Sequence, residues 1–265
     1  MVMQHIGLVA LDVDGVLRDA SRLFYECHAR SLKLVNLDIE FSRCFGIKDI
    51  WHFKGMAKFN NKRDSLSTIY SIAKSGRLAE VCSMIYEADA ESRISEIMES
   101  CTERPSHDEL GMMVNEYVRT ATSAEAHRLV RVYPHAARSI NKIRDSMVKM
   151  AIVSNSDILT IERDLKHLMP EFDHVVSSRD VSALKPSGEG LRLVSKMSGV
   201  DTSDMIYVGD TVVDIRAAKD AGCASAVVLS GMGLESHLRN EKPDMVFEDL
   251  VKAAEWMEKS LLEHV

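Results

Sequence analysis

The sequence lacks the basic segments that several classes of protein need. It has no cluster of lysine and arginine, and its formal net charge is -7. It therefore carries neither the basic stripe that binds a nucleic-acid backbone nor the basic patch that binds an anionic membrane. A small phosphorylated molecule is not excluded, because one lysine and one metal ion can reverse the charge of a site locally.

Cysteine pairs and long apolar runs are missing as well. The five cysteines are scattered and form no CxxC pair, which favours free thiols in a reducing compartment over disulfides or a zinc site. The apolar run at residues 6–11 is too short to cross a membrane, and no basic segment precedes it. We therefore expect a cytoplasmic protein that binds neither nucleic acid nor a membrane.

Short, continuous apolar runs predict the strands of a parallel sheet, because strands buried on both faces have this pattern. The runs occupy residues 6–15, 149–153, 205–208 and 224–229, with a weaker run at 174–177. Helical patterns separate them: one begins at Pro134, and one ends before Gly222, a typical residue just past a helix end. Alternating strands and helices predict an α/β fold with a doubly wound, Rossmann-like parallel sheet.

The stretch between about residues 18 and 131 differs, because it contains no convincing strand. Helical spacing is present at residues 23–35, 65–73, 77–98 and 108–118. Ser106 and Glu109 have the spacing of a capping box before the last of these. We predict two domains: an α/β core of residues 1–17 and 132–265, and an all-helical domain of residues 18–131 inserted after the first strand.

Two aspartates, Asp12 and Asp14, lie at the end of the first predicted strand. Ligands bind outside the carboxyl ends of the strands in open α/β sheets, and alternation along a strand would place both side chains on one side. Carboxylates this close require either a metal ion or a proton on one of them, and both outcomes suit a nucleophile beside an acid/base. An ordinary polar turn is the competing explanation, whereas an EF-hand calcium loop is disfavoured because its late glutamate is missing.

Two later segments offer groups that bind phosphate. Ser154 and Asn155 follow the run at 149–153, where a hydroxyl and amides can hold phosphate oxygens, although such a segment is also a common turn. Lys185 precedes a proline, which places it in a loop rather than on a helix. Its ammonium group can neutralise a phosphate there, and a solvated surface lysine is the alternative.

A third segment adds two more carboxylates. Asp210 directly follows the run at 205–208, and Asp214 lies four residues further on, one turn along if a helix starts here. Both can then face one metal ion, although Asp214 could instead cap the helix. Together the strand ends supply carboxylates, groups that donate hydrogen bonds to a phosphate, and one cation. This set suits Mg²⁺.

These segments resemble the four motifs of the haloacid-dehalogenase-like superfamily, in the superfamily's order. They read Asp12-Val-Asp14-Gly-Val, Ser154-Asn155, Lys185-Pro186, and Gly209-Asp210 with Asp214. The helical insertion after the first motif is similar to the helical, C1-type cap of members such as phosphoglycolate phosphatase and β-phosphoglucomutase. The resemblance implies a magnesium-dependent phosphatase, a phosphoric monoester hydrolase that acts on a small phosphorylated metabolite such as phosphoglycolate or a sugar phosphate.

The resemblance also implies a role for each motif residue. Asp12 is the nucleophile that forms an aspartyl-phosphate, and Asp14 is the acid/base. Magnesium is held by the carboxylates of Asp12 and Asp210 and by the backbone carbonyl of Asp14, with Asp214 in support. The phosphoryl group is held by Ser154 and Asn155, and Lys185 stabilises its charge.

Position 14 narrows the chemistry, because the dehalogenases and phosphonatases of the superfamily differ there, and an acid/base fits phosphate esters. Two alternatives remain. A phosphomutase of the β-phosphoglucomutase type would share all four motifs and return the phosphoryl group to a second hydroxyl. A non-catalytic binding protein on the same fold is the other, and it would be marked by the loss of a motif residue, which the sequence does not show.

One segment of the helical domain is a candidate for substrate contact. Residues 54–64 combine a glycine, basic residues and two asparagines, and are similar to an asparagine-containing cap segment of some phosphoglycolate-phosphatase-like members. We expect Lys58, Asn60 or Asn61 to contact the leaving group of the substrate. Capping of the next helix by Asn61 or Asp64 is an equally good explanation.

Overall fold

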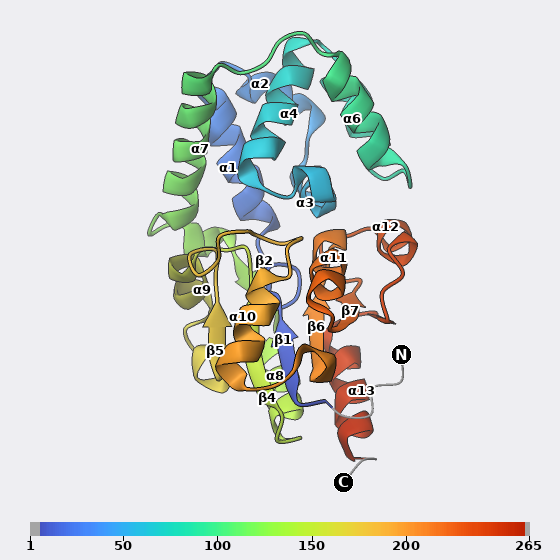
Figure 1. Ribbon diagram of the computed structural model, residues 1–265. Helices are drawn as coiled ribbons and strands as arrows, with labels where there is room; N and C mark the ends of the chain where they lie inside the picture. Colours follow the sequence, from blue (N-terminus) through green and yellow to red (C-terminus); the bar gives the residue numbers. More distant parts are fainter. Residues whose placement is uncertain (1–5, 263–265) are drawn as a thin grey trace. The chain divides into compact units, whose positions relative to one another are not determined.

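The computed structural model describes residues 6–262 (Figure 1). The chain divides into two compact units. Met1–Asp19 and Arg131–Val265 form the first, which we call the α/β unit, and Ala20–Val130 form the second, the helical unit. The sequence placed these boundaries at 17/18 and 131/132. No helix among residues 6–262 is both long enough and apolar enough to cross a membrane.

A sheet of six parallel strands forms the centre of the α/β unit. Its spatial order is β5-β4-β1-β6-β7-β8. The strands are β1 (Leu8–Leu11), β4 (Lys149–Val153), β5 (His174–Val176), β6 (Met205–Gly209), β7 (Ala224–Val228) and β8 (Met245–Phe247). The predicted doubly wound parallel sheet is confirmed. The short β8 was not predicted, and β1 ends earlier than its apolar run, at Leu11.

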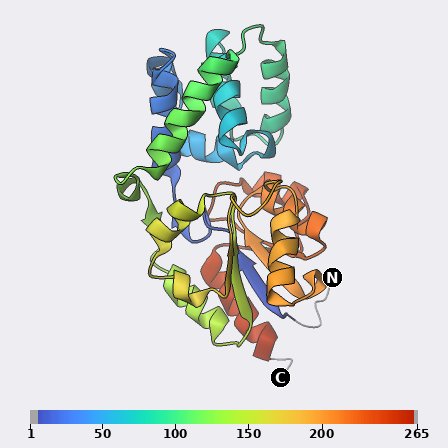
Figure 2. The same cartoon turned by 60° about the vertical axis from the view of Figure 1, so that its left-hand side comes forward.

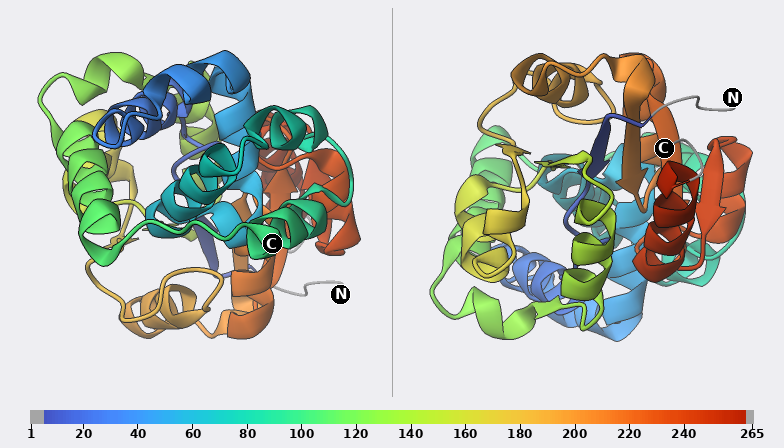
Figure 3. Two further views of the ribbon diagram at one scale, coloured as in Figure 1. Left: turned by 90° about the horizontal axis from the view of Figure 1, so that it is seen from above. Right: turned by 90° about the horizontal axis from the view of Figure 1, so that it is seen from below.

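Helices cover both faces of this sheet (Figure 3). On one face Val9 and Leu11 pack in a core shared with α8 (Ala136–Arg144), α9 (Ile158–Leu165) and α13 (Leu250–Leu262). On the other, Leu8 and Ala10 pack in a core shared with α10 (Glu189–Ser198) and α11 (Val212–Ala221). Each fully buried side chain of this size stabilises the fold by about 1.5–3 kcal/mol before entropy is subtracted. Both faces of β1 are therefore fixed by burial, which explains its continuous apolar sequence. A further helix, α12, spans Glu235–Asn240.

Register brings the loops after β1, β4 and β6 to one edge of the sheet. Leu11 is paired with Ile152 of β4 and with Val208 of β6, so the residues that follow these three strands lie at the same level. Strands β4 and β5 lie on one side of β1, and the later strands β6, β7 and β8 lie on its other side, so the strand order reverses at β1. Ligands of open α/β sheets bind at such a reversal of strand order.

The helical unit contains seven α-helices among its residues: α1 (Ser21–Lys33), α2 (Asp38–Cys44), α3 (Ile47–Gly55), α4 (Lys62–Lys74), α5 (Leu78–Met84), α6 (Ala90–Ser100) and α7 (His107–Thr122). Helices α1 and α7 pack against each other (Figure 2). The predicted capping box of α7 is confirmed, since Ser106 Oγ accepts from the Glu109 N–H at 3.2 Å and Glu109 accepts from the Ser106 N–H at 2.8 Å. The single helix predicted over 77–98 is wrong, because a turn between Met84 and Ala90 divides it into α5 and α6.

Two very short strands lie where the chain passes between the units. Strand β2 (Arg18–Asp19) pairs antiparallel with β3 (Arg131–Val132), so that Asp19 is the partner of Arg131. These strands contradict the prediction that residues 18–131 are free of strands, because two-residue strands are too short to show a periodicity. The helix predicted to begin at Pro134 begins at Ala136.

Candidate functional site

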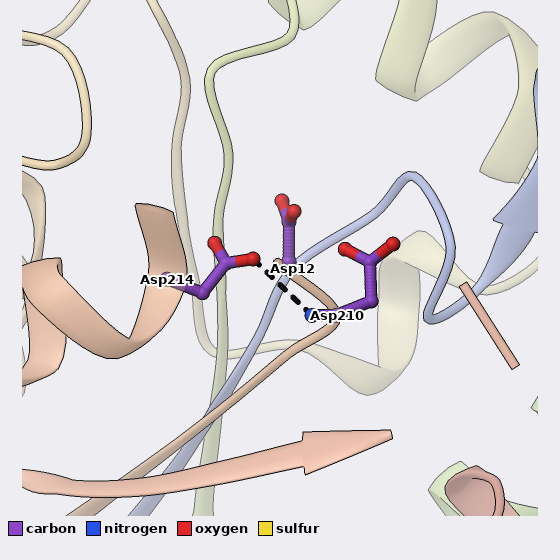
Figure 4. Close-up of side chains that lie close together, drawn as sticks. All are labelled: Asp12, Asp210 and Asp214. Atoms are coloured by element: carbon purple, nitrogen blue, oxygen red, sulfur yellow. Dashed lines mark hydrogen bonds between the residues drawn. The ribbon is translucent and has the colours of Figure 1, made fainter. Parts of the chain in front are cut away.

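Three aspartates meet at the strand ends of the α/β unit. Asp12 follows β1, Asp210 follows β6, and Asp214 lies in the first turn of α11 (Figure 4). One carboxylate oxygen from each lies within 4.8 Å of the others, and all three residues are buried. Like charges this close in a buried site require a cation or bound protons.

The carboxylate of Asp210 fills a space that two glycines leave open. A Cβ on Gly15, whose φ is +81°, would lie 1.9 Å from Asp210 Oδ2, and a Cβ on Gly231 would lie 2.1 Å from the same atom. Asp210 Oδ2 accepts a hydrogen bond from the Met232 N–H at 2.6 Å. The other oxygen, Oδ1, is buried and has no hydrogen-bond partner among residues 6–262. A buried oxygen without a donor is a suitable ligand for a metal ion.

Lys185 supplies positive charge to this cluster. Its Nζ lies 3.1 Å from Asp12 Oδ1 and 2.6 Å from Asp214 Oδ1, and it donates to the Tyr207 hydroxyl at 2.6 Å. The side chain is only 6% exposed, so the alternative of a solvated surface lysine is wrong. Burial alone would lower the pKa of Lys185, but the charges of Asp12 and Asp214 raise it above its usual value. Lys185 is therefore an ammonium ion at neutral pH.

Asp214 connects the start of α11 to Lys185. Its Oδ2 accepts from the Thr211 N–H at 2.9 Å, from the Thr211 hydroxyl at 2.6 Å and from the Asp210 N–H at 3.2 Å. With Thr211 as N-cap this is a capping box, so the helix-capping explanation describes Asp214 well. Its other oxygen accepts from Lys185. Asp214 thus links the helix end to the lysine.

Asp14 lies in a different environment from Asp12. Strand β1 ends before both residues, so the expected alternation along a strand does not apply to them. The Asp14 carboxylate accepts from Arg18 Nε at 2.8 Å and from the Ser156 hydroxyl at 2.6 Å, whereas Asp12 is the partner of Lys185. The two aspartates therefore have separate cationic partners.

The segment after β4 fixes the loop that carries Lys185. Asn155 Oδ1 accepts from the Lys185 N–H at 2.9 Å, and Asn155 Nδ2 donates to the Lys185 carbonyl at 3.2 Å. Ser154 is buried beside it, and its hydroxyl oxygen accepts from the Ser156 N–H at 3.2 Å. The Asn155 amide keeps one N–H that these contacts do not use.

Burial and charge shift the pKa values of the four aspartates in opposite directions. Burial raises the pKa of Asp12 to about 6, with Lys185 opposing the rise and Asp214 adding to it. Burial and the neighbouring Asp214 and Asp12 raise the pKa of Asp210 well above its usual value. At Asp14 and Asp214 burial also acts upward, but Arg18 and Lys185 respectively outweigh it and lower the pKa. At Asp12 and Asp210 the positive charge of Lys185 thus does not offset burial and the neighbouring carboxylates, and their oxygens fit a hard divalent cation such as Mg²⁺.

The candidate residues of the helical unit have local partners. Asn61 is the N-cap of α4, because its Oδ1 accepts from the Asp64 N–H at 2.9 Å. The side-chain amide of Asn60 donates to the Lys54 carbonyl at 3.0 Å, and Lys58 is exposed. Capping therefore accounts for the presence of Asn61, and contact of these residues with a substrate stays a prediction.

Three residues that hold the site together were not predicted from the sequence. They are Arg18, Thr211 and Tyr207, whose hydroxyl donates to the Val153 carbonyl at 2.7 Å and also lies 3.2 Å from Asp214 Oδ1. Thr211 and Asp214 had the spacing of a capping box, which is a usable signal. Arg18 and Tyr207 gave only a weak signal, as single polar residues within or next to apolar runs.

The fold and the strand-end cluster define an α/β protein with a buried site of carboxylates and one lysine at the switch point of a parallel sheet. A family model described as haloacid dehalogenase-like hydrolase matches residues 86–228, more than half of the sequence. The chain belongs to this family. The matched region contains Ser154, Lys185, Asp210 and Asp214 and begins after Asp12 and Asp14.

Curated relatives match over a shorter region. The chain is 31% identical over 133 residues to a phosphoglycolate phosphatase of Pseudomonas syringae pv. tomato, which covers 48% of this chain and 47% of that protein. It is 31% identical over 127 residues to a phosphoglycolate phosphatase of Salmonella paratyphi A, which covers 46% of this chain and 50% of that protein. The chain thus spans about half the length of the curated relatives it matches.

Solved structures share the fold over almost the whole chain. A structure described as a predicted phosphoglycolate phosphatase from Haemophilus somnus has a TM-score of 0.68 at 17% identity and covers 97% of this chain and 99% of its own. A hydrolase from Pseudomonas syringae has a TM-score of 0.67 at 16% identity and covers 96% of this chain and 98% of its own. Together with the sheet order, this similarity confirms an α/β core with an inserted helical unit.

Proposed function

We propose that the protein is a magnesium-dependent phosphatase that hydrolyses a small phosphate monoester through an aspartyl-phosphate on Asp12. The observation that carries the proposal is the pairing of the buried Asp12 with Lys185 beside an Asp210 oxygen to which no described residue donates a hydrogen bond. Phosphoryl transfer depends mainly on placement and on neutralisation of charge, and this cluster supplies both.

The reaction has two steps. Arg18 and Ser156 lower the pKa of Asp14, so its carboxylate takes up a proton from solvent before the first step. A carboxylate oxygen of Asp12 attacks phosphorus, the bond from phosphorus to the ester oxygen breaks, and the protonated Asp14 gives that oxygen its proton. A water molecule then attacks the aspartyl-phosphate, Asp14 takes the proton of the water, and the Asp12 carboxylate is restored with release of inorganic phosphate. The net reaction consumes one ester and one water.

The other residues bind the phosphoryl group and hold charge. The Ser154 hydroxyl and the unused N–H of Asn155 donate to phosphoryl oxygens, and the ammonium group of Lys185 neutralises them. Mg²⁺ would be held by Asp12, Asp210 and the Asp14 backbone carbonyl, and when bound it withdraws charge from the phosphoryl oxygens. Asp214 acts indirectly, because its contacts with Thr211 and Lys185 keep the lysine beside Asp12.

The names of the relatives support a class of substrate. Several of them are named phosphoglycolate phosphatase, which supports phosphoglycolate or a similar small phosphorylated metabolite. We also propose a cytoplasmic location, since all five cysteines are free thiols and suit a reducing compartment.

Release of p-nitrophenol from its phosphate, with and without Mg²⁺, tests the proposal. We expect metal-dependent hydrolysis in the wild type and a loss of about 1,000-fold or more in Asp12→Asn, because the nucleophile is removed. Asp145→Asn is the matched control, since Asp145 is an exposed residue at the end of α8, and it should keep full activity. Undiminished hydrolysis in Asp12→Asn would contradict the proposal.

A phosphate-release screen over phosphorylated metabolites then identifies the substrate. Hydrolysis of one small monoester with stoichiometric phosphate is the expected result. An isomerised product without released phosphate would assign a phosphomutase instead. A wild type that is inactive on every ester of the panel would leave only the binding-protein alternative.

A further inference from the structure

Arg18 is a buried arginine next to the proposed acid/base. It lies on β2, is 1% exposed and belongs to the α/β unit together with Asp14. Its Nε donates to Asp14 Oδ1 at 2.8 Å, and its Nη2 lies 3.4 Å from Asp14 Oδ2. The guanidinium group therefore contacts both oxygens of one carboxylate, a planar arrangement that a lysine cannot reproduce.

The opposite side of the guanidinium group is fixed by helix α9. Arg18 Nη1 donates to Asp164 Oδ2 at 2.6 Å and to the Thr160 carbonyl at 3.0 Å. Asp164 is also paired with Arg163, at 2.6 Å. The charges thus alternate along Arg163, Asp164, Arg18 and Asp14 and sum to zero, which lowers the cost of burying them.

The backbone around Asp14 is fixed as well. The Gly15 N–H donates to the Arg18 carbonyl at 2.8 Å, and the Arg18 N–H donates to the Val13 carbonyl at 3.1 Å. Rotation of the Asp14 side chain is therefore restricted by a closed loop of main chain on one side and by Arg18 and Ser156 on the other. Among residues 6–262, Asp14 Oδ1 accepts from Arg18 alone, so one of its two lone-pair positions is left for a reacting group.

We propose that Arg18, held by Asp164, is a positioning residue that orients the Asp14 carboxyl group toward the oxygen that leaves phosphorus. The inference rests on the proposed function, because it requires Asp14 to transfer a proton to that oxygen. Proton transfer needs a heavy-atom distance within hydrogen-bond reach, and a displacement of about 1 Å can cost about 100-fold in rate. Arg18 itself would touch neither the substrate nor the metal ion.

The test compares two esters with different leaving groups. p-Nitrophenolate leaves phosphorus readily without a proton, whereas phenolate is more basic and needs one. In Arg18→Lys we expect kcat for phenyl phosphate to fall about ten-fold or more beyond any fall for p-nitrophenyl phosphate, with KM little changed. Asp164→Asn should shift kcat in the same direction by a smaller factor, because the Thr160 carbonyl still holds Nη1.

Two further variants make the result specific. In the Asp14→Asn background, Arg18→Lys should cause no additional loss, because its effect passes through Asp14. Arg192→Lys is the matched control: Arg192 pairs with Asp220 on the exposed surface of the same unit, and this variant should treat both esters as the wild type does. If Arg18→Lys does not fold, as judged by its thermal melt, Asp164→Asn provides the comparison of the two esters.

The outcomes separate this inference from the proposed function. Equal losses on both esters, a gain in kcat, or an additive loss in the Asp14→Asn background would overturn the role of Arg18 while the phosphatase stands. A wild type that hydrolyses neither ester would overturn the proposed function and this inference together.

Discussion

Asp12 and Asp14 are two positions apart, yet their carboxyl groups have opposite pKa shifts. Burial acts upward on both. At Asp12 it exceeds the effect of Lys185, and the pKa rises to about 6, whereas at Asp14 Arg18 and Ser156 outweigh it and the pKa falls. The difference arises because Lys185 is shared with Asp214, while Arg18 contacts both oxygens of Asp14.

The shift of Asp12 predicts a pH-dependent stability of the metal-free protein. Because its folded-state pKa lies above the usual value of 3.8, the proton on Asp12 stabilises the fold below that value, and this contribution is lost as pH rises toward 6. Asp12→Asn cannot lose a proton. With a chelator present, its unfolding free energy should therefore gain about 1–3 kcal/mol relative to the wild type between about pH 4 and pH 7. Urea titrations across this range measure the difference, and parallel curves for the two proteins would contradict the shift.

For single residues, the positions at the strand ends could be predicted from the sequence, but the side chains that they contact could not. The location of Asp12, Lys185 and Asp210 in loops after or between predicted strands could be read from neighbouring residues. The partner of Arg18 in helix α9, Asp164, is 146 positions away in the chain. No local pattern encodes a contact over that separation, so the role of Arg18 required the structure.

Helices α7 and α11 both begin with a capping box in which an N-cap hydroxyl takes part. At α7 it consists of Ser106 and Glu109, and at α11 of Thr211 and Asp214. The first belongs to the helical unit, whereas the second lies in the α/β unit and includes Asp214, which also holds Lys185. The same local motif therefore serves stability in one unit and the proposed site in the other.

Removal of the two N-cap hydroxyls should separate these effects. Ser106→Ala and Thr211→Ala should each lower the unfolding free energy by about 0.5–2 kcal/mol, because each leaves a helix N–H or carboxylate without its partner. Only Thr211→Ala should also lower kcat, since Asp214 loses a donor that fixes it beside Lys185. Denaturant unfolding measures the free energy of each variant, and turnover of p-nitrophenyl phosphate measures its kcat. Equal effects on kcat would show that Asp214 does not depend on its cap.

Longer strands were predictable, whereas β5 was the one strand of two or three residues within residues 6–262 that the sequence predicted, from the weaker run at 174–177. Strand β4 has the predicted bounds, because five consecutive residues of one pattern carry a clear signal. Strands β2, β3 and β8 contain two or three residues each. So few residues cannot show the alternation of side chains that identifies a strand. Their pairing is decided by neighbouring strands rather than by their own side chains.

The chain leaves the α/β unit and returns to it at neighbouring positions, because Asp19 of β2 is paired with Arg131 of β3. We expect the α/β unit to fold without the helical unit when a two-residue Asn-Gly turn joins Asp19 to Arg131, since its six strands and both of its cores come from its own residues. Cooperative thermal unfolding and circular dichroism of the shortened protein test this. A protein without a cooperative transition would show that the α/β unit needs the helical unit.

The architecture of the α/β unit was predictable at the level of class. Buried apolar runs that alternate with helices lead to a parallel sheet, and polar residues after several runs indicated which edge carries the site. The order β5-β4-β1-β6-β7-β8 was not predictable, because each run carries information about its own burial and none about its neighbours.

The β2–β3 pair also affects how the gene can change. Since the helical unit leaves and rejoins the α/β unit at one antiparallel pair, a single exchange of genetic material between the codons for Asp19 and Arg131 can replace it without altering the register of any sheet strand. Selection can then act on the helical unit while Asp12, Lys185 and Asp210 keep their surroundings in the sheet.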